Sequence, residues 1–173
     1  MRQALKPHPD SPCAAVSAIE VCATRPDAGA LLLSYEVTGS IGDLRLPPIV
    51  ASMRADELWR HTCFEVFVRP AAGAAYFEFN FAPSSQWAAY RFDGYRSGMR
   101  AAEIGPPRID VQCTPTRFTL RAALTCDALP SDPWRLGLSA VIEETSGRLS
   151  YWALAHPAGK PDFHNADCFR CEI

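Results

Sequence analysis

The feature that most constrains this fold is a series of short apolar segments, separated by turn-forming residues. Clusters of Gly, Pro, Asp and Ser, such as residues 69–73 and 129–133, stand between them. Short runs rich in Val, Phe, Tyr, Leu and Trp and bounded in this way are typical of β-strands. The strands expected on this basis are residues 15–23, 30–37, 62–69, 75–81, 86–92, 108–113, 117–124, 134–143 and 148–154.

The same pattern excludes long helices. The chain has 15 prolines, which gather in the presumed loops and would break a long helix. Residues 51–59 and 96–103 can each hold a turn or two of helix. A succession of strands with few short helical turns predicts an all-β protein built as an antiparallel β-sandwich. A length of 173 residues suits one domain over residues 1–173.

Charge and hydropathy narrow the possible partners. The chain carries 17 basic and 19 acidic residues, a net charge of -2, with no cluster of Lys and Arg. Nucleic acids and anionic membranes require a concentrated positive surface, so neither is expected as a partner. No run of about 18 apolar residues occurs, and the first residues lack the apolar stretch of an export signal. We therefore expect a cytoplasmic protein.

The cysteines do not suggest a disulfide framework. There are seven of them, an odd number, and most lie within or beside apolar runs, as buried thiols do. Cys168 and Cys171 have the spacing of a metal-binding or redox pair. A structural zinc site uses four ligands and a redox pair precedes a helix, and neither context is present. Reduced cysteines and no metal are expected.

Alternation within the strands divides core from surface. One parity of the central strands is apolar, which predicts that Phe64, Val66, Val68, Phe77, Phe79, Phe81, Leu120, Leu136 and Leu138 form one core. The opposite parity collects polar groups, with an aromatic ring among them. Either it is an ordinary solvated face with ion pairs between strands, or it is a ligand surface. Its expected members are Glu65, Phe67, Tyr76, Glu78, Asn80, Arg117, Thr119 and Arg121.

Two tryptophans favour the ligand surface. Trp87 has the parity of Arg91, opposite Tyr90, and Trp152 is out of phase with Tyr151. A tryptophan on a polar face provides the stacking area that a ring-shaped polar ligand requires. Burial of these rings in the core is an equally good interpretation, and Trp134 is assigned to the core.

The loop after the last long strand has an unusual density of functional side chains. His156, Lys160, Asp162 and His164 occur among prolines and a glycine, directly after an aromatic strand. Such a loop either binds a ligand or pins the C-terminal segment across the end of the sandwich, with Phe163 as a plug.

Three motifs in this order allow a family resemblance to be stated. They are LWRHTCFEVFV at 58–68, YFEFNFAP at 76–83 with WAAYRF at 87–92, and YWALAHPAGKPDFH at 151–164. Over residues 10–171 the chain resembles the DOMON-like domains that are related to family 9 carbohydrate-binding modules. The resemblance implies an immunoglobulin-like, jelly-roll-like β-sandwich that binds a ligand without catalysis, the ligands of the wider superfamily being sugars or haem.

What the resemblance implies about ligands is only partly matched by the residues. No Asp-rich loop suited to calcium is present. Met53 or Met99 with His61 or His156 can be drawn as a haem-ligand pair, but their spacing singles out none of them. The leading hypothesis is thus a saccharide or sugar-containing metabolite, without a cofactor. The alternatives are a carrier of haem or another redox cofactor, and a module that docks another protein.

Catalysis is not expected. Glu65 and Glu78 on neighbouring strands could mimic the carboxylate pair of a glycoside hydrolase, but an arginine such as Arg91 or Arg121 more often bridges such a pair. Carried over residue by residue, the resemblance places one ligand site at Trp59, Glu65, Glu78, Asn80, Trp87, Arg91, Trp152, His156, Lys160, Asp162 and His164.

Overall fold

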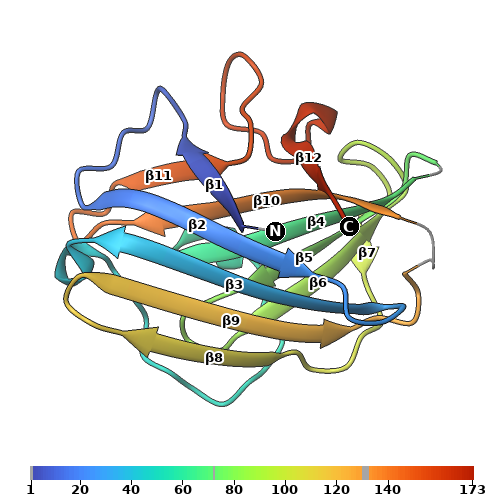
Figure 1. The fold of residues 1–173 in the computed structure, drawn as a ribbon, viewed down its shortest axis with the longest axis horizontal. Helices are drawn as coiled ribbons and strands as arrows, with labels where there is room; N and C mark the ends of the chain where they lie inside the picture. The colour runs from blue at the N-terminus through green and yellow to red at the C-terminus, as the bar shows by residue number, and fades with distance from the viewer. Residues whose placement is uncertain (1, 72, 130–132) are drawn as a thin grey trace.

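The computed structural model describes residues 2–71, 73–129 and 133–173, and Figure 1 shows them as two layers of β-strands. No α-helix occurs among these residues, and none of their helical turns is long and apolar enough to cross a membrane. Three 3-10 turns are present: η1 (Ile41–Asp43), η2 (Leu58–Arg60) and η3 (Ala166–Cys168). The strands are β1 (Arg2–Pro7), β2 (Val16–Thr24), β3 (Ala30–Gly39), β4 (Cys63–Pro70), β5 (Tyr76–Phe81), β6 (Trp87–Phe92), β7 (Arg100–Ala101), β8 (Arg108–Cys113), β9 (Arg117–Thr125), β10 (Trp134–Glu143), β11 (Leu149–Ala153) and β12 (Phe169–Glu172).

The strands pair antiparallel along one path, in the order β7-β6-β5-β4-β10-β11-β1-β2-β3-β9-β8, and β12 pairs with β10. The first four residues of β1 pair with β2 and its last two residues pair with β11, so this strand passes from one layer to the other. We call the layer of β2, β3, β9 and β8 sheet A, and the layer of β7, β6, β5, β4, β10, β11 and β12 sheet B. The all-β sandwich expected from the sequence is confirmed.

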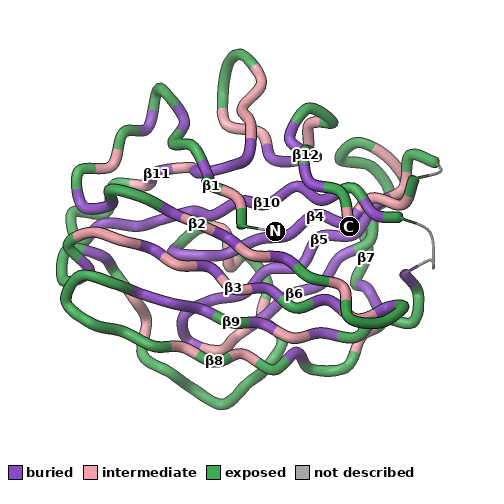
Figure 2. The backbone as a smooth tube through the Cα atoms, in the orientation of Figure 1, coloured by how far each residue is buried: buried purple, intermediate pink, exposed green. Residues whose placement is uncertain are grey.

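Large apolar side chains from both sheets form the core between them. Phe64 of β4 stacks on Phe118 of β9 with ring centroids 5.7 Å apart. The buried Tyr35 hydroxyl of β3 donates a hydrogen bond to the backbone carbonyl of Glu65 on β4 at 2.7 Å, which joins the two layers. Figure 2 shows the buried residues concentrated on the central strands. All nine residues predicted for the core lie in this cluster, which confirms the expected parity of Phe64, Val66, Val68, Phe77, Phe79, Phe81, Leu120, Leu136 and Leu138.

The nine strands expected from the sequence are all present, with ends that differ by at most two residues. Three strands were not expected. β1 buries only Leu5, β7 has two exposed residues, and β12 is four residues long, so none of them has a long apolar pattern. The expected helical turn in 51–59 is reduced to η2, and the segment 96–103 contains β7 instead of a helix.

Sheet B is covered on both faces. A second apolar cluster lies on its outer face, the face turned away from sheet A, and includes Phe67, Tyr90 and Phe163. As a result every residue of β5 is buried. One expectation is corrected here: Arg117, Thr119 and Arg121 belong to β9 of sheet A, so they share no face with Glu78 and Asn80.

Candidate functional site

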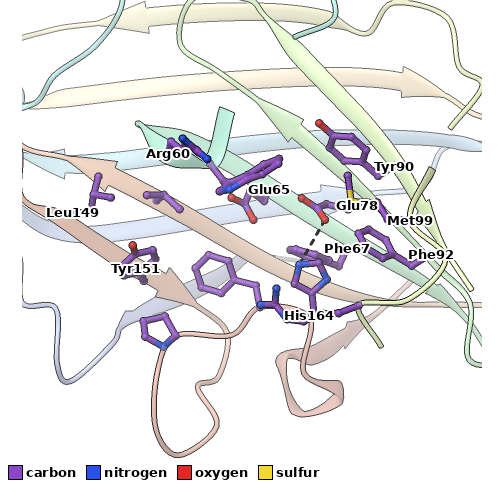
Figure 3. A pocket seen from close by; sticks show the side chains of 15 residues that line it. Arg60, Glu65, Phe67, Glu78, Tyr90, Phe92, Met99, Leu149, Tyr151 and His164 are labelled. Carbon is purple, nitrogen blue, oxygen red and sulfur yellow. Dashed lines mark ion pairs between the residues drawn. The ribbon is translucent and has the colours of Figure 1, made fainter. Parts of the chain in front are cut away.

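A cavity of about 530 Å³ lies against the outer face of sheet B (Figure 3). Strands β4, β5, β6, β10 and β11 provide its floor, and the turn η2 with the loops after β6 and β11 provides its rim. Figure 3 shows Glu65 and Glu78 between Leu149 and Tyr151 on one side and Tyr90 and Phe92 on the other. The lining residues are Trp59, Arg60, Glu65, Phe67, Glu78, Tyr90, Phe92, Arg96, Met99, Val141, Leu149, Tyr151, Pro161, Phe163 and His164.

The strand register brings the lining side chains together. Glu78 of β5 lies opposite both Phe67 of β4 and Tyr90 of β6, and Val141 of β10 lies opposite Tyr151 of β11. Residues directly opposite in neighbouring strands point to the same face of a sheet. The residues between them point to the core, so alternate residues of the same strands form the core of the sandwich and the floor of the cavity.

A row of polar residues crosses the same face. Ser139 of β10, Glu65 of β4 and Asn80 of β5 are direct cross-strand neighbours. Among the described residues, no hydrogen-bond partner reaches the buried Ser139 Oγ, Glu65 Oε1 or Asn80 Oδ1. The Asn80 amide donates to Glu78 Oε1 at 2.8 Å. Because buried polar atoms are almost always paired in folded proteins, these oxygens are available to a bound molecule or to water.

Burial keeps the two floor carboxyls from ionising easily. The pKa of Glu65 is raised well above its ordinary value by burial and by the nearby charge of Glu78. Burial also raises the pKa of Glu78 to about 7, although the Asn80 hydrogen bond and the charge of Arg96 oppose this shift. Burial thus favours the protonated form of both carboxyls, and a protonated carboxyl can donate as well as accept a hydrogen bond.

His164 closes the floor from the loop side. Its Nδ1 lies 2.7 Å from the Tyr76 hydroxyl and its Nε2 lies 3.7 Å from Glu78 Oε2. Its ring packs edge-on against Phe67 and Phe92, with centroids 5.0 and 5.1 Å apart. Burial lowers the pKa of His164 to about 4, and the charge of Arg96 adds to this effect. His164 is therefore neutral at pH 7, and its contact with Glu78 is not an ion pair there.

Asp162 fastens the loop after β11 to the loop after β6. Its carboxylate accepts hydrogen bonds from Arg96 Nη2 at 2.8 Å and from the Tyr95 hydroxyl at 2.6 Å. Arg96 adopts a left-handed backbone conformation (φ 50°), and its backbone N–H donates to the Tyr76 hydroxyl at 3.2 Å. Backbone strain of this kind persists where the surrounding contacts fix it, here at the rim of the cavity.

Six of the residues expected in the site lie in or beside this cavity. Trp59, Glu65, Glu78 and His164 line it directly. Asn80 and Asp162 hydrogen-bond to lining residues, Asn80 to Glu78 and Asp162 to Arg96.

The two tryptophans expected as stacking walls are not on this face, which corrects the expectation for them. Trp87 and Trp152 are buried in the core between the sheets. The Arg54 guanidinium covers the Trp87 ring at 4.5 Å, and the Trp152 Nε1 donates to Ser150 Oγ at 3.0 Å. The parity of Tyr90, and not that of Trp87, faces the cavity. The rim tryptophan is Trp59, which packs edge-on against Tyr90 with centroids 6.1 Å apart.

Arg91, His156 and Lys160 are also outside the cavity lining. The Arg91 guanidinium lies 5.7 Å from the Phe77 ring, on the core side of β6, so it does not bridge the floor carboxyls. His156 Nε2 lies 2.8 Å from the backbone carbonyl of Lys6, and the His156 ring packs edge-on against His8. Lys160 is exposed on the loop.

Sequence reasoning missed most of the aromatic lining. Tyr90 and Phe92 of β6, Tyr151 of β11 and Phe163 of the loop all contribute to it. A signal was present in the motif WAAYRF, which has aromatic residues of both parities. Such a strand is buried on both faces, so its outward residues contact a second apolar layer rather than solvent.

Cys168 and Cys171 take structural places. All seven are free thiols. Cys171 lies in the core, whereas the Cys168 thiol lies 3.2 Å from the carbonyl of Ala155 and 3.3 Å from that of Asp162. Cys168 thus holds the ends of the loop after β11. No group of three or more His, Cys, Asp or Glu side chains within residues 2–71, 73–129 and 133–173 is arranged to hold a metal ion.

No protein-family model and no curated protein matches the sequence. Among solved structures, the chain is similar to a protein from Bacteroides uniformis, provisionally described as carbohydrate-binding, with a TM-score of 0.72 and 15% identity over 98% of this chain and 84% of that one. It also has a lower similarity to a family 9 carbohydrate-binding module from Caldicellulosiruptor kristjanssonii. The structure of that module in complex with glucose matches this chain with a TM-score of 0.48, at 13% identity over 82% of this chain and 69% of that one. Its structure in complex with cellotriose matches with a TM-score of 0.49, at 15% identity over 82% of this chain and 67% of that one.

Proposed function

We propose that the protein is a non-catalytic binding domain that takes a saccharide, or a metabolite containing one, into the cavity on the outer face of sheet B. The observation that carries this proposal is the composition of the cavity. Aromatic rings form its walls, and its floor contains the buried Glu65 Oε1, which no partner in the described chain reaches and whose cross-strand neighbours Ser139 and Asn80 also have such oxygens.

The walls suit the apolar faces of a sugar ring. Trp59, Tyr90 and Phe92 stand on one side, and Tyr151 and Phe163 belong to β11 and its following loop. Aromatic faces offer large, rigid contact areas to such a ring at little entropic cost. The volume of about 530 Å³ falls within the range of small-molecule sites, which is about 300–1,000 Å³.

The floor suits the hydroxyl groups of a sugar. Glu65 Oε1 is a buried oxygen that no partner in the described chain reaches, and Glu78 and His164 line the cavity with it. A sugar hydroxyl both donates and accepts, so it can use a protonated carboxyl, a carboxylate or a neutral imidazole. Leaving such a group unpaired costs about 1–3 kcal/mol, and a ligand hydroxyl relieves this cost.

The similarity to a solved structure agrees with the fold on which this proposal rests. At 15% identity the Bacteroides uniformis protein supports the β-sandwich fold. Its description as carbohydrate-binding belongs to that protein, and here the cavity residues carry the argument. The three sequence motifs support a finer placement among the DOMON-like domains.

The floor geometry favours binding over hydrolysis. Glycoside hydrolases place two carboxyls on either side of the scissile bond, one to protonate it and one to attack or to activate water. Glu65 and Glu78 come from adjacent strands and point to the same face of one sheet. Both therefore contact a ligand from below, and neither is positioned across it from the other.

The cavity residues do not fit haem. His164 and Met99 are the histidine and methionine of the lining. However, His164 Nδ1 is hydrogen-bonded to Tyr76 and its Nε2 faces Glu78, so ligation would break this arrangement. Met53, His61 and His156 lie outside the lining.

The test is calorimetric titration of the purified protein with a panel of mono- and disaccharides. A member of the panel should bind to the wild type, and Trp59→Ala should weaken that binding by about tenfold or more, because it removes a stacking wall. The control is Ile49→Ala, which alters an exposed apolar residue outside the lining. Absence of binding across the panel, or equal binding by Trp59→Ala, would contradict the proposal.

A further inference from the structure

Among the residues that the structure describes, no Lys or Arg forms an ion pair with either floor carboxyl. Glu65 is 2% exposed and Glu78 is 5% exposed, yet both line the cavity. Within the described part of the chain, no basic side chain lies within ion-pair distance of Glu65, and the contact of Glu78 is with the neutral His164 at 3.7 Å. Unpaired carboxyls are rarely buried, because the loss of hydration is not repaid.

The cations of the lining are already committed to other carboxylates. Arg60 Nη2 lies 2.8 Å from Glu57 Oε1, and Arg96 Nη2 lies 2.8 Å from Asp162 Oδ1. No further lysine or arginine occurs among the residues that line the cavity in the described chain. Among the described residues, the lining thus has two acids without a cation partner and no base without a carboxylate partner, which disfavours an anionic ligand such as a sugar phosphate.

The aromatic walls add to this preference. The negative face of an aromatic ring attracts a cation, and the attraction is greater where water is excluded. Phe67 and Tyr90, on either side of Glu78 in the cross-strand row, both line the cavity. Carboxyl groups on the floor and aromatic rings on the walls are the surroundings that a buried ammonium group requires.

We infer that the saccharide carries a basic amino group, as hexosamines do, and that its ammonium binds between Glu65 and Glu78. This inference rests on the proposed function, because it names the class of saccharide for the same cavity. The ammonium would donate hydrogen bonds to the two carboxyls, including the unpartnered Glu65 Oε1, while the ring lies against the aromatic walls.

The test compares each amino sugar with its parent hexose. D-glucosamine, D-galactosamine and D-mannosamine are titrated against D-glucose, D-galactose and D-mannose at about pH 6, where an amine of this type is protonated. At least one hexosamine should bind the wild type about tenfold or more tightly than its parent hexose. N-acetyl-D-glucosamine, which has no charge, should lose this advantage.

Two variants locate the amine. Glu65→Gln and Glu78→Gln keep the shape of the side chain and remove its charge, so each should reduce the preference for the hexosamine towards unity. Glu172→Gln serves as the control, because Glu172 is an exposed carboxylate of β12 paired with Arg135. Thermal melts establish that each variant is folded.

Proton release gives a readout that needs no variant. Binding an ammonium favours the ionised carboxyls, so titration in two buffers of different ionisation enthalpy should show net release of protons with the hexosamine and none with the hexose. The other titratable groups near the pair do not release protons here, since burial raises the pKa of each phenol and thiol and His164 is neutral. These groups are Tyr35, Cys63, Tyr76, Tyr90 and His164.

The outcomes separate the two proposals. Equal binding of hexosamine and hexose would overturn the inference and leave the saccharide function standing. A preference that persists in both Gln variants without proton release would also overturn it, since the amine would then lie elsewhere. Binding of no sugar at all would overturn the function and the inference together.

Discussion

Glu65 of β4 lies directly opposite Asn80 of β5, and each has a buried oxygen that no donor in the described chain reaches. The pair lies on the outer face of sheet B, and Glu65 lines the cavity together with the loops after β6 and β11 and the turn η2. Folded proteins seldom keep such atoms unless a bound molecule or water satisfies them. The polar row therefore agrees better with the proposed binding floor than with a stabilising element.

Ser139→Ala tests whether this row stabilises the empty protein. Ser139 Oγ has no partner among the described residues, so its removal should leave the free energy of unfolding unchanged or raise it by about 1 kcal/mol. The matched control is Ser150→Ala, which loses the hydrogen bond from Trp152 Nε1 at 3.0 Å and should cost about 1 kcal/mol. Urea unfolding measures both. A loss for Ser139→Ala as large as that of the control would be the contrary result.

Phe79→Ala tests the core. Phe79 is fully buried between the sheets, so the variant should lose about 3–5 kcal/mol of unfolding free energy through lost burial and an internal cavity. Met53→Ala changes a side chain that is 54% exposed and should have a small effect by the same assay. Similar values for the two variants would show that the parity of β5 is inverted.

Trp59 and Trp152 should respond in opposite ways to substitution by Ala. Trp152 is 3% exposed in the core, so Trp152→Ala should cost about 3–5 kcal/mol of stability. Trp59 lies half-buried at the rim, so Trp59→Ala should keep most of the stability and lose saccharide affinity. Chemical denaturation and titration calorimetry on both variants separate these effects. If the Trp152→Ala variant were stable and failed to bind the saccharide, Trp152 would belong to the binding site and not to the core.

The pH dependence of stability should contain two opposing contributions from neighbouring groups. Burial raises the pKa of Glu78 from 4.5 to about 7, so its stabilising contribution is present below 4.5 and is lost as the pH rises through about 7. Burial lowers the pKa of His164 from 6.5 to about 4, so its contribution is present above 6.5 and is lost as the pH falls through about 4.

Glu78→Gln removes the first contribution and leaves the second. Between about pH 5 and 7 the unfolding free energy of this variant should therefore rise more steeply with pH than that of the wild type. His164→Asn should show the reverse change. Urea unfolding at several pH values measures these slopes. Parallel curves for wild type and both variants would contradict the burial of these two groups.

Much of the fold follows from strand alternation, because the core of a sandwich has a period of two along each strand. Phe77, Phe79 and Phe81 could be placed in the core from their spacing alone. The alternation cannot say which face is the core when both faces are apolar. In β6 the rings of Trp87 and Tyr90 have opposite parities, and only the structure shows that Trp87 belongs to the core cluster and Tyr90 to the outer one.

The site could be predicted in part for the same reason. Glu65, Glu78 and His164 were predictable from the sequence, because polar groups stand out within apolar strands or on a loop rich in functional side chains. Arg96 and Phe163 were not, since their positions depend on how two loops fold over the sheet. The contact of Asp162 with Arg96 joins residues 66 positions apart, and no local pattern in the sequence indicates it.

The most direct test of the central claim is a crystal structure of the protein grown with the saccharide that binds most tightly in the panel. The account predicts a sugar ring in the cavity on sheet B, packed against Trp59 and with a polar atom within hydrogen-bond distance of the Glu65 carboxyl. A sugar bound elsewhere, for example on the outer face of sheet A, with this cavity holding only water, would contradict it.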